Sequence, residues 1–181
     1  MHYTDIIRFW FKETSPRQWF TKDKAFDEEI RTKFLEIFQK VVRGETKEWR
    51  EVPEGRLAEI IVLDQFSRNM FRDTPEAFKY DQMALSLAQE AVRVGDDKKL
   101  TGTERYFIYV PYMHSESRDI HKKAIWFFLS LPFEDWWSWI KFEFKHKKII
   151  DHFGRYPHRN KILGRISTPE EVEFLKKNSG F

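Results

Sequence analysis

The basic segment 153–165 holds the residues of this chain that are best suited to bind an anion. Its sequence, FGRYPHRNKILGR, holds four cations, Arg155, Arg159, Lys161 and Arg165, and no acidic residue. A guanidinium presents parallel N–H donors that match a carboxylate or a phosphate, and the neighbouring Gly and Pro residues shape the backbone around such a group. We therefore expect this segment either to bind an external anion or to clamp a carboxylate of the protein itself.

A second polar cluster lies within an otherwise apolar stretch and offers acceptors for these arginines. Asp64 and Arg68 are four residues apart, so on a helix both side chains lie on one face and can pair, and Gln65 and Asn69 have the same spacing. An unsatisfied buried polar group costs about 1 to 3 kcal/mol, so an internal network that ties helices together also explains the cluster. The internal carboxylates that could accept from the arginines are Asp64, Asp81 and Glu116.

A third cluster, YVPYMHSES at residues 109–117, offers groups for acid–base chemistry. His114 could act as a general base with Glu116 to orient it, and His158 is a second candidate for the base. Ser115 adds a hydroxyl, but adjacent helical residues point in different directions and the chain has no GxSxG turn, which disfavours a hydrolytic triad. An enzyme of this kind would use the arginines to hold a phosphate or carboxylate substrate.

Neither a metal nor a cofactor is predicted. His146, His152 and His158 are spaced by six residues, whereas two ligands on one helical face need a spacing of four, and no HExxH motif occurs. The chain has no Cys, which excludes disulfides, thiolate metal sites and thiol catalysis and is compatible with a reducing cytosol.

Composition predicts one globular domain over residues 1–181, because 18 Phe, 7 Trp and 6 Tyr supply a large core. A net charge of +3 does not indicate nucleic-acid binding, although residues 141–165 hold eight Lys or Arg against two acidic residues. The lysines among these are typical of a solvated helical face. The longest apolar run, 124–133, is about half of what a membrane span needs. We expect a soluble, cytoplasmic protein without a membrane-spanning segment.

Helical spacing of apolar residues dominates the chain and predicts an all-α fold of seven or eight helices in antiparallel pairs, without a regular repeat. Pro111 is expected to end the fifth helix, and Thr168 with Glu171 forms a capping box for a short last helix. The predicted helices cover residues 4–11, 24–43, 53–70, 73–94, 101–109, 118–131 and 134–152, followed by one that begins near 169.

Three long motifs carry a family resemblance: LDQFSRNMFR at 63–72, YVPYMHSE at 109–116, and FGRYPHRNKILGR followed by STPEE at 153–171. With RFWF, QWF and AFDEEI near the start, the chain resembles the bacterial domain of unknown function 924 family, whose fold is similar to tetratricopeptide-repeat helical domains. Two positions depart from the family pattern, with Ser67 where Pro is frequent and His121 where Gln is common. The polar motif residues that the resemblance implies are Asp64, Gln65, Arg68, Asn69, Arg72, Asp81, His114, Ser115, Glu116, His146, Arg155, His158, Arg159, Asn160 and Arg165.

The sequence therefore predicts a tetratricopeptide-like binding domain with a polar groove that takes an anionic small molecule or an acidic peptide. Two alternatives stay open: an enzyme with a His and Glu pair, and polar motifs that serve only the structure. Nucleic acid is a less favoured partner, and the oligomeric state is not predicted. The residues expected to line the groove are Asp64, Arg68, His114, Glu116, Arg155, His158, Arg159 and Arg165.

Overall fold

The computed structural model describes residues 1–178, including all side chains except those of residues 133–138. Within this range the chain folds into helices without a β-strand, which confirms the predicted all-α class. The α-helices are α1 Tyr3–Arg8, α2 Pro16–Phe20, α3 Lys24–Val42, α4 Pro53–Ile61, α5 Ser67–Met70, α6 Asp81–Val94, α7 Gly102–Met113, α8 Arg118–Leu129, α9 Phe133–Phe153 and α10 Pro169–Lys177. Short 3-10 turns lie at Lys47–Glu51, Pro75–Ala77, Asp97–Lys99 and Pro157–Arg159.

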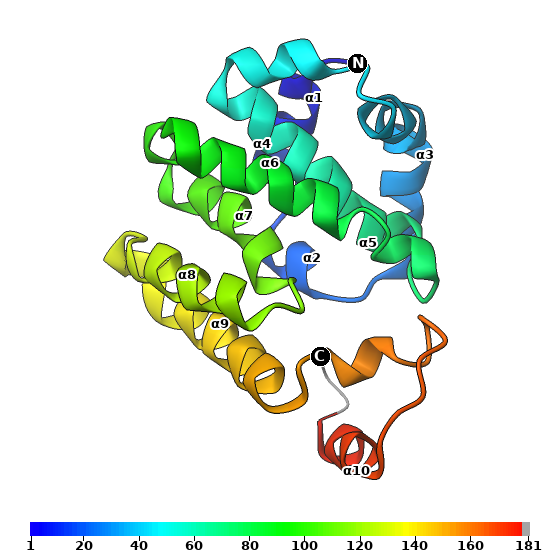
Figure 1. The fold of residues 1–181 in the computed structure, drawn as a ribbon. Helices are drawn as coiled ribbons and strands as arrows, with labels where there is room; N and C mark the ends of the chain where they lie inside the picture. Colours follow the sequence, from blue (N-terminus) through cyan, green and yellow to red (C-terminus); the bar gives the residue numbers. More distant parts are fainter. Residues whose placement is uncertain (179–181) are drawn as a thin grey trace.

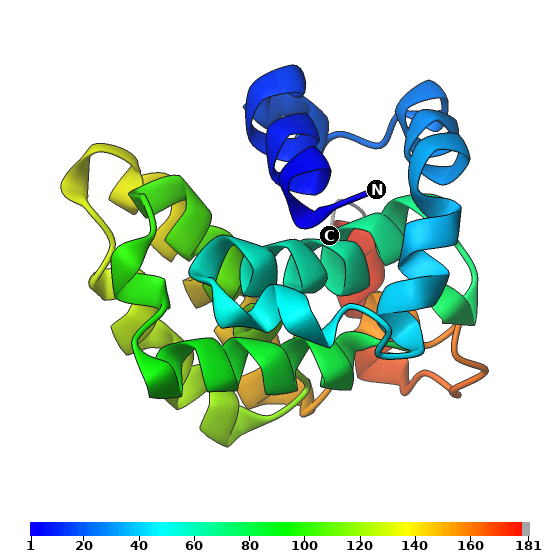
Figure 2. The same ribbon diagram turned by 90° about the horizontal axis from the view of Figure 1, so that it is seen from above.

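The helices pack in chain order around a central element, α4. This helix contacts α1, α6 and α7, and the stack continues from α6 through α7 and α8 to α9 (Figures 1 and 2). All but its first two residues are buried, including Arg56 and Glu59, which pair with Asp96 and Arg50. The segment after α9 turns back and carries the 3-10 turn at Pro157–Arg159, which contacts α10. The basic segment is thereby brought back toward the helices that precede it in sequence.

The helix that begins at Pro53 contains one wide turn at the polar cluster. Residues Val62–Phe66 form a π-helical turn between α4 and α5, and Asp64 lies inside it. Such turns weaken the regular backbone ladder and are frequent at functional sites. Here side chains bind the carbonyls of the turn: the Ser67 hydroxyl donates to the Leu63 carbonyl at 2.6 Å, and Arg68 Nη1 donates to the Asp64 carbonyl at 2.6 Å. The wide turn is thus stabilised by the same arginine that pairs with Asp64.

Three predicted helices have bounds that differ from the structure. The fifth predicted helix does not end before Pro111, since α7 continues to Met113. Proline lacks the N–H that the Phe107 carbonyl would accept, but its fixed φ is itself helical, and the surrounding residues are buried. His114 therefore becomes the C-terminal cap of α7.

The fourth predicted helix begins at Asp81 rather than near Asp73. The Thr74 hydroxyl donates to the Phe71 carbonyl at 2.8 Å instead of capping a helix, and Asp73 takes a left-handed φ of 62°. Only a 3-10 turn, Pro75–Ala77, forms before α6. Asp81 is thus the first residue of α6 and lies at the positive end of its helix dipole.

The first helix also differs from its prediction, since α1 ends at Arg8 and a π-helical turn covers Phe9–Glu13. The short helix α2, which was not predicted, places Trp19 against the core: its ring lies 5.1 Å from that of Phe107, centroid to centroid. None of the helices within residues 1–178 is long and apolar enough to cross a membrane.

Candidate functional site

A histidine and a buried aspartate form the centre of the polar cluster. His114 Nδ1 lies 2.7 Å from Asp64 Oδ1, and the Asp64 side chain is only 1% exposed, whereas 17% of the His114 side chain is exposed. Gln65 Nε2 also donates to Asp64, at 2.5 Å. The carboxylate is therefore held inside the protein while the imidazole reaches its surface.

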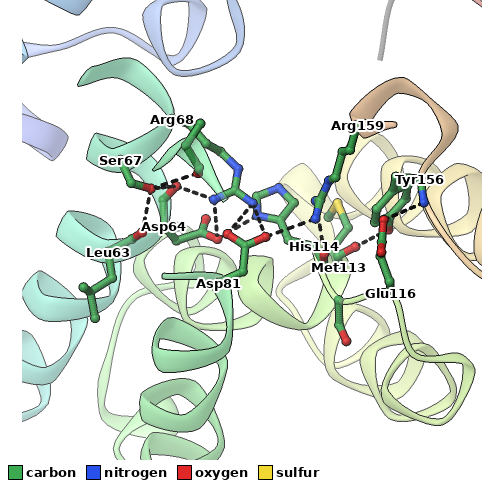
Figure 3. Close-up of polar contacts among 12 residues, drawn as sticks. Leu63, Asp64, Ser67, Arg68, Asp81, Met113, His114, Glu116, Tyr156 and Arg159 are labelled. Atoms are coloured by element: carbon green, nitrogen blue, oxygen red, sulfur yellow. Dashed lines mark hydrogen bonds and ion pairs between the residues drawn. The ribbon is translucent and has the colours of Figure 1, made fainter. Parts of the chain in front are cut away.

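Two arginines and a second aspartate complete this cluster. Arg68 Nη1 lies 3.1 Å from Asp64 Oδ1, which confirms the pairing expected from their spacing, and Arg68 Nη2 donates to Asp81 Oδ2 at 2.9 Å. Arg159 Nη1 donates to the same oxygen at 3.1 Å and Nη2 donates to the His114 carbonyl at 3.1 Å. Figure 3 shows these side chains, from α5, α6 and the Pro157–Arg159 turn, converging beside His114. Arg159 thus joins the basic segment to the first residue of α6 and to the C-terminal cap of α7.

The protonation states follow from these contacts. Burial alone would raise the pKa of Asp64, but the charge of Arg68, with the hydrogen bonds from His114 and Gln65, outweighs it and holds that pKa below its usual range. Burial, together with the positive charge of Arg68, lowers the pKa of His114. A neutral imidazole faces an ionised carboxylate, which only accepts hydrogen bonds, so Nδ1 carries the proton. His114 Nε2 is then an unprotonated acceptor, the state that a general base requires.

A cleft rich in cations lies on one side of His114, with a volume of about 370 Å³. Its lining contains four Lys or Arg residues and one acidic residue, Asp73. Burial lowers the pKa of His158 to about 4 and that of His146 to about 3, so both imidazoles are neutral at pH 7. The residues that define this cationic cleft are Lys22, Arg68, Arg72, Asp73, Ala77, Phe78, His114, His146, His158, Arg159 and Ile162.

A second cleft of about 430 Å³ is mainly aromatic and apolar. It shares Arg68, His114 and His146 with the cationic cleft, so these three side chains lie at the junction of the two. The other residues that define this aromatic cleft are Trp19, Phe20, Gln65, Tyr106, Phe107, Val110, Met113, Phe142, Lys145 and Asn178. His114 and Arg159 also line a third cavity, of about 310 Å³, beside Ser115 and Glu116.

Arg155 and Arg165 are engaged elsewhere, in what we call the carboxylate lock: Glu116, Arg155, Asn160, Arg165 and Glu171. Arg165 donates twice to Glu116, at 2.6 and 2.9 Å, and Arg155 donates twice to Glu171, at 2.7 and 2.8 Å. Asn160 joins the two pairs, since its amide donates to Glu171 at 3.1 Å and accepts from Arg165 at 2.9 Å. Both arginines therefore clamp internal carboxylates.

Glu171 has two structural roles in this lock. The carboxylate accepts from the Thr168 N–H at 2.7 Å, in the predicted capping box of α10, while it binds Arg155. The Arg155 hydrogen bonds, with those from Thr168 and Asn160, lower the pKa of Glu171 to about 2. The side chain is 2% exposed, so this ionised group depends on its donors.

A second histidine–carboxylate pair, His121 and Glu143, is buried next to the candidate site. His121 Nδ1 lies 2.7 Å from Glu143 Oε1, and neither side chain is exposed. His121 Nε2 lies 2.9 Å from the Ser115 carbonyl, which only accepts, so Nε2 is protonated. Burial raises the pKa of Glu143. The pair joins α8 and α9 to the turn after His114, and it explains how His121 is accommodated at a position where the family resemblance suggested Gln.

No group of three or more His, Cys, Asp or Glu side chains suited to a metal ion occurs among the residues that the structure describes. His152 lies apart from the cluster and pairs with Glu170 at 2.7 Å. It also lines the largest cavity described, of about 590 Å³ between α9 and α10, which includes none of the predicted site residues. Size alone therefore does not identify the candidate site.

Comparison with known proteins places the chain in a family. A family model described as a bacterial protein of unknown function, DUF924, matches residues 6–179. The chain belongs to this family. A solved structure of ATU0120, a protein of unknown function from Agrobacterium tumefaciens, is similar over 97% of each chain, with 36% sequence identity and a TM-score of 0.91. None of the curated proteins matches this chain.

In this DUF924 protein the predicted site residues separate into distinct groups. Asp64, Arg68, His114, His158 and Arg159 lie together around the two clefts, whereas Glu116, Arg155 and Arg165 belong to the carboxylate lock. Glu116 does not orient His114, contrary to the sequence-based expectation, because its oxygens accept from Arg165 and from the Tyr156 N–H at 2.8 Å. Asp64 takes that role.

Several residues of the site were not found from sequence. Gln65 and Asn69 do not pair with each other: Asn69 donates to Asp27 at 2.8 Å, and Arg72 binds the same carboxylate at 2.5 and 2.6 Å. The AFDEEI motif that contains Asp27 was the available signal for this partner. The aromatic cleft was missed because its walls come from helices far apart in the chain. Lys22 and Phe20 were missed as well, since the short helix beside them was not predicted.

Proposed function

We propose that this protein binds a small anionic ligand in the cationic cleft beside His114. The observation that supports this proposal best is the position of His114, which lines three cavities beside the buried Arg159 and the partly buried Arg68. Arg68 and Arg159 are held in place by aspartates before any ligand arrives, so their ordering costs little on binding. Preorganised arginines favour anions that accept two parallel hydrogen bonds from one guanidinium, such as carboxylate and phosphate.

The lining of the cleft presents more cations than acidic side chains, which supports an anion over a cation as the ligand. Lys22 lies exposed at the rim, Arg72 is held by Asp27, and Asp73 is the one acidic residue of the described lining. The three imidazoles add hydrogen-bonding groups without adding charge at pH 7. A bound anion would favour the protonated forms of these imidazoles, so binding should take up more protons as the pH falls toward the pKa values of His158 and His146.

Thermal unfolding with inorganic phosphate, citrate and adenosine monophosphate tests the proposal. A ligand at one hundred times its dissociation constant stabilises a protein by about 2.7 kcal/mol, or roughly 5 to 11 °C for a domain of this size. We expect at least one anion to raise the melting temperature, and Lys22→Glu to reduce that shift. Lys123→Glu, on the exposed surface of α8, changes the net charge equally and should keep the shift. Equal losses in both variants, or no shift with any anion, would contradict the proposal.

A second candidate function is acid–base catalysis at the same site. The specific observation that favours it is the Asp64–His114 pair, because an ionised carboxylate on Nδ1 leaves Nε2 free to accept a proton from a substrate or a water. In this role His114 is the general base, Asp64 orients it, and Arg68 stabilises negative charge that develops on the substrate. Glu116, which the sequence suggested as the orienting acid, has no part in it.

Turnover of p-nitrophenyl acetate and p-nitrophenyl phosphate tests this second function. Loss of a general base should reduce kcat/KM by about 100-fold or more in His114→Ala, whereas His152→Ala, remote from the clefts, should leave it unchanged. Because the pKa of His114 is lowered from the ordinary value of 6.5, kcat/KM should be level around pH 7 and should fall only at a pH below 6.5. Turnover that survives in His114→Ala would exclude His114 as the base.

A further inference from the structure

The aromatic cleft lies directly beside the proposed anion site. Binding of an anion by the cationic groups gives this aromatic cleft no role. Trp19 turns its polar atom away from the cleft: the indole N–H donates to Thr14 Oγ1 at 2.7 Å and to the Trp10 carbonyl at 3.0 Å. The ring itself lines the cleft together with Phe107, whose side chain is otherwise buried. The wall at this point is therefore apolar and has no unmet hydrogen bond to offer a polar ligand.

Two aromatic rings at the mouth of the aromatic cleft remain open to solvent. Phe20 is 53% exposed and Phe142 is 41% exposed, and their rings are stacked, with centroids 6.1 Å apart and an angle of 15° between planes. These side chains come from α2 and α9, which are far apart in sequence but meet here. Apolar side chains gathered at the entrance of an apolar cavity are typical of a surface that buries an apolar group on binding.

The cationic and aromatic clefts form one continuous lining. Arg68, His114 and His146 line both clefts, so only these three side chains lie between a charged group at Arg68 and the apolar wall that includes Phe107 and Phe142. Cavities of about 430 and 370 Å³ fall within the range of about 300 to 1,000 Å³ typical of small-molecule sites. A ligand that occupied only one cleft would leave unused either the charged lining or the aromatic lining that meet at these three residues.

We propose that the ligand is an amphipathic anion, with a carboxylate or phosphate head in the cationic cleft and an unbranched apolar tail in the aromatic cleft. This inference rests on the proposed anion binding and adds the class of the ligand. Lys145, at the rim of the aromatic cleft, lies beside Phe142 with its Nζ 5.9 Å from the ring centroid, so a cation also borders the tail entrance. The same head and tail occur in free fatty acids, in alkyl phosphates and in anionic lipids of a membrane.

Isothermal titration with matched probes separates the contributions of head and tail. Decanoate and decyl phosphate carry both, acetate and inorganic phosphate carry only the head, decanol carries only the tail, and decyltrimethylammonium reverses the charge. We expect monomeric decanoate or decyl phosphate to bind at least tenfold more tightly than acetate, phosphate, decanol and decyltrimethylammonium. Vesicles that contain phosphatidic acid distinguish a free ligand from a membrane lipid, and tighter binding to the vesicles than to monomers would overturn the proposed monomeric ligand.

Two exposed aromatic side chains provide a matched pair of variants. Phe142→Ala should weaken decanoate binding roughly tenfold, because the tail loses an apolar contact, and should leave phosphate binding unchanged. Trp126→Ala removes a side chain that is 73% exposed and outside both clefts, so it should leave decanoate binding unchanged. Both replaced residues are exposed enough for the variants to fold.

The outcomes separate this inference from the proposed function. If acetate or phosphate binds as tightly as decanoate and Phe142→Ala has no effect, the amphipathic ligand is wrong while anion binding stands. If decyltrimethylammonium binds as tightly as decanoate, the aromatic cleft takes apolar chains without regard to charge, and the inference is also wrong. If no anionic probe binds and Lys22→Glu changes nothing, both proposals fail. An acidic peptide that displaces decanoate and binds more tightly would overturn the small-molecule ligand.

Discussion

Arg165 and Arg159 lie six residues apart in one basic segment, yet they serve different regions of the molecule. In the carboxylate lock, Arg165 and Arg155 each place two donors on one internal carboxylate, and Asn160 joins the two pairs. At the His114 site, Arg159 shares Asp81 with Arg68 and lines two cavities. Both regions contain arginines that pair with carboxylates. In the lock these arginines clamp internal carboxylates, whereas at the His114 site they also line cavities.

The difference shows how a structural arginine can be told from a candidate binding arginine. The lock closes a loop on α10, and Glu171 within it is almost fully buried. At the His114 site Asp64 and Asp81 pair with the arginines. The imidazole of His114 and the guanidinium groups of Arg68 and Arg159 line the cationic cleft. Removing one partner of a buried ion pair destabilises the fold, whereas cations that are held in place along a cavity can also bind a ligand. Substitutions should therefore affect folding in the lock and ligand binding at the site.

The largest effect on stability is expected from Glu171→Gln. The neutral amide cannot hold the Arg155 guanidinium in the same way and loses the charge at the start of α10, so we expect the free energy of unfolding to fall by about 2 to 3 kcal/mol. Denaturant unfolding followed by circular dichroism measures the change. The matched control is Glu170→Gln, an exposed neighbour that pairs with His152, for which we expect less than about 0.5 kcal/mol. Equal effects would show that the lock does not stabilise the fold.

Acid should weaken the lock in a defined range of pH. The folded pKa of Glu171 is about 2, below the ordinary value of 4.5, so its contribution is present above pH 4.5 and is lost as pH falls from 4.5 toward 2. Stability curves of the protein and of Glu171→Gln should therefore converge over that range. Curves that stay parallel from pH 5 to 3 would contradict this role.

A smaller loss of stability and a complete loss of ligand response are expected from His114→Ala. Asp64 keeps Arg68 and Gln65 as partners, so the loss of one hydrogen bond should cost about 1 to 2 kcal/mol. The shift in melting temperature with phosphate or decanoate should disappear. His114→Asn retains a polar group but cannot place a second ring nitrogen in the clefts, and we expect it to fold and to lack the ligand response as well. A full response in either variant would remove His114 from the site.

The smallest effect on stability is expected from Lys22→Glu. This residue is exposed, so the free energy of unfolding should change by less than about 0.5 kcal/mol, while anion affinity should fall several-fold at low salt. The loss should shrink as sodium chloride is raised, because screening weakens the attraction of a rim charge. Titration at two salt concentrations measures both effects. An affinity loss that is independent of salt would indicate a direct contact instead.

Local spacing in the sequence predicts the local parts of this arrangement. The Asp64–Arg68 pair follows from four-residue spacing, and the capping box at Thr168 and Glu171 follows from its motif. Asp81 and Glu116 were correctly named as acceptors for the arginines, with Arg159 and Arg165 as their partners in the structure. The all-α class follows from the spacing of apolar residues.

Contacts between distant segments could not be predicted in the same way. Asp64 and His114 are 50 residues apart, and their contact depends on α7 continuing through Pro111, against the usual preference of proline. Glu171 was interpreted only as a capping residue, although it is also the partner of Arg155. The resemblance to the DUF924 family indicated which polar residues belong to the family motifs, but it did not indicate which of them line the same cavity. That division depends on packing in three dimensions.

The most direct test compares ligand-induced stabilisation in Glu171→Gln and His114→Ala. Thermal unfolding of both variants and of the unchanged protein is measured with and without inorganic phosphate and decanoate. We predict that Glu171→Gln melts at the lowest temperature but keeps the ligand-induced rise, whereas His114→Ala melts at a higher temperature than Glu171→Gln and shows no rise. A rise that is lost in Glu171→Gln and retained in His114→Ala would contradict the division into a structural lock and a binding site.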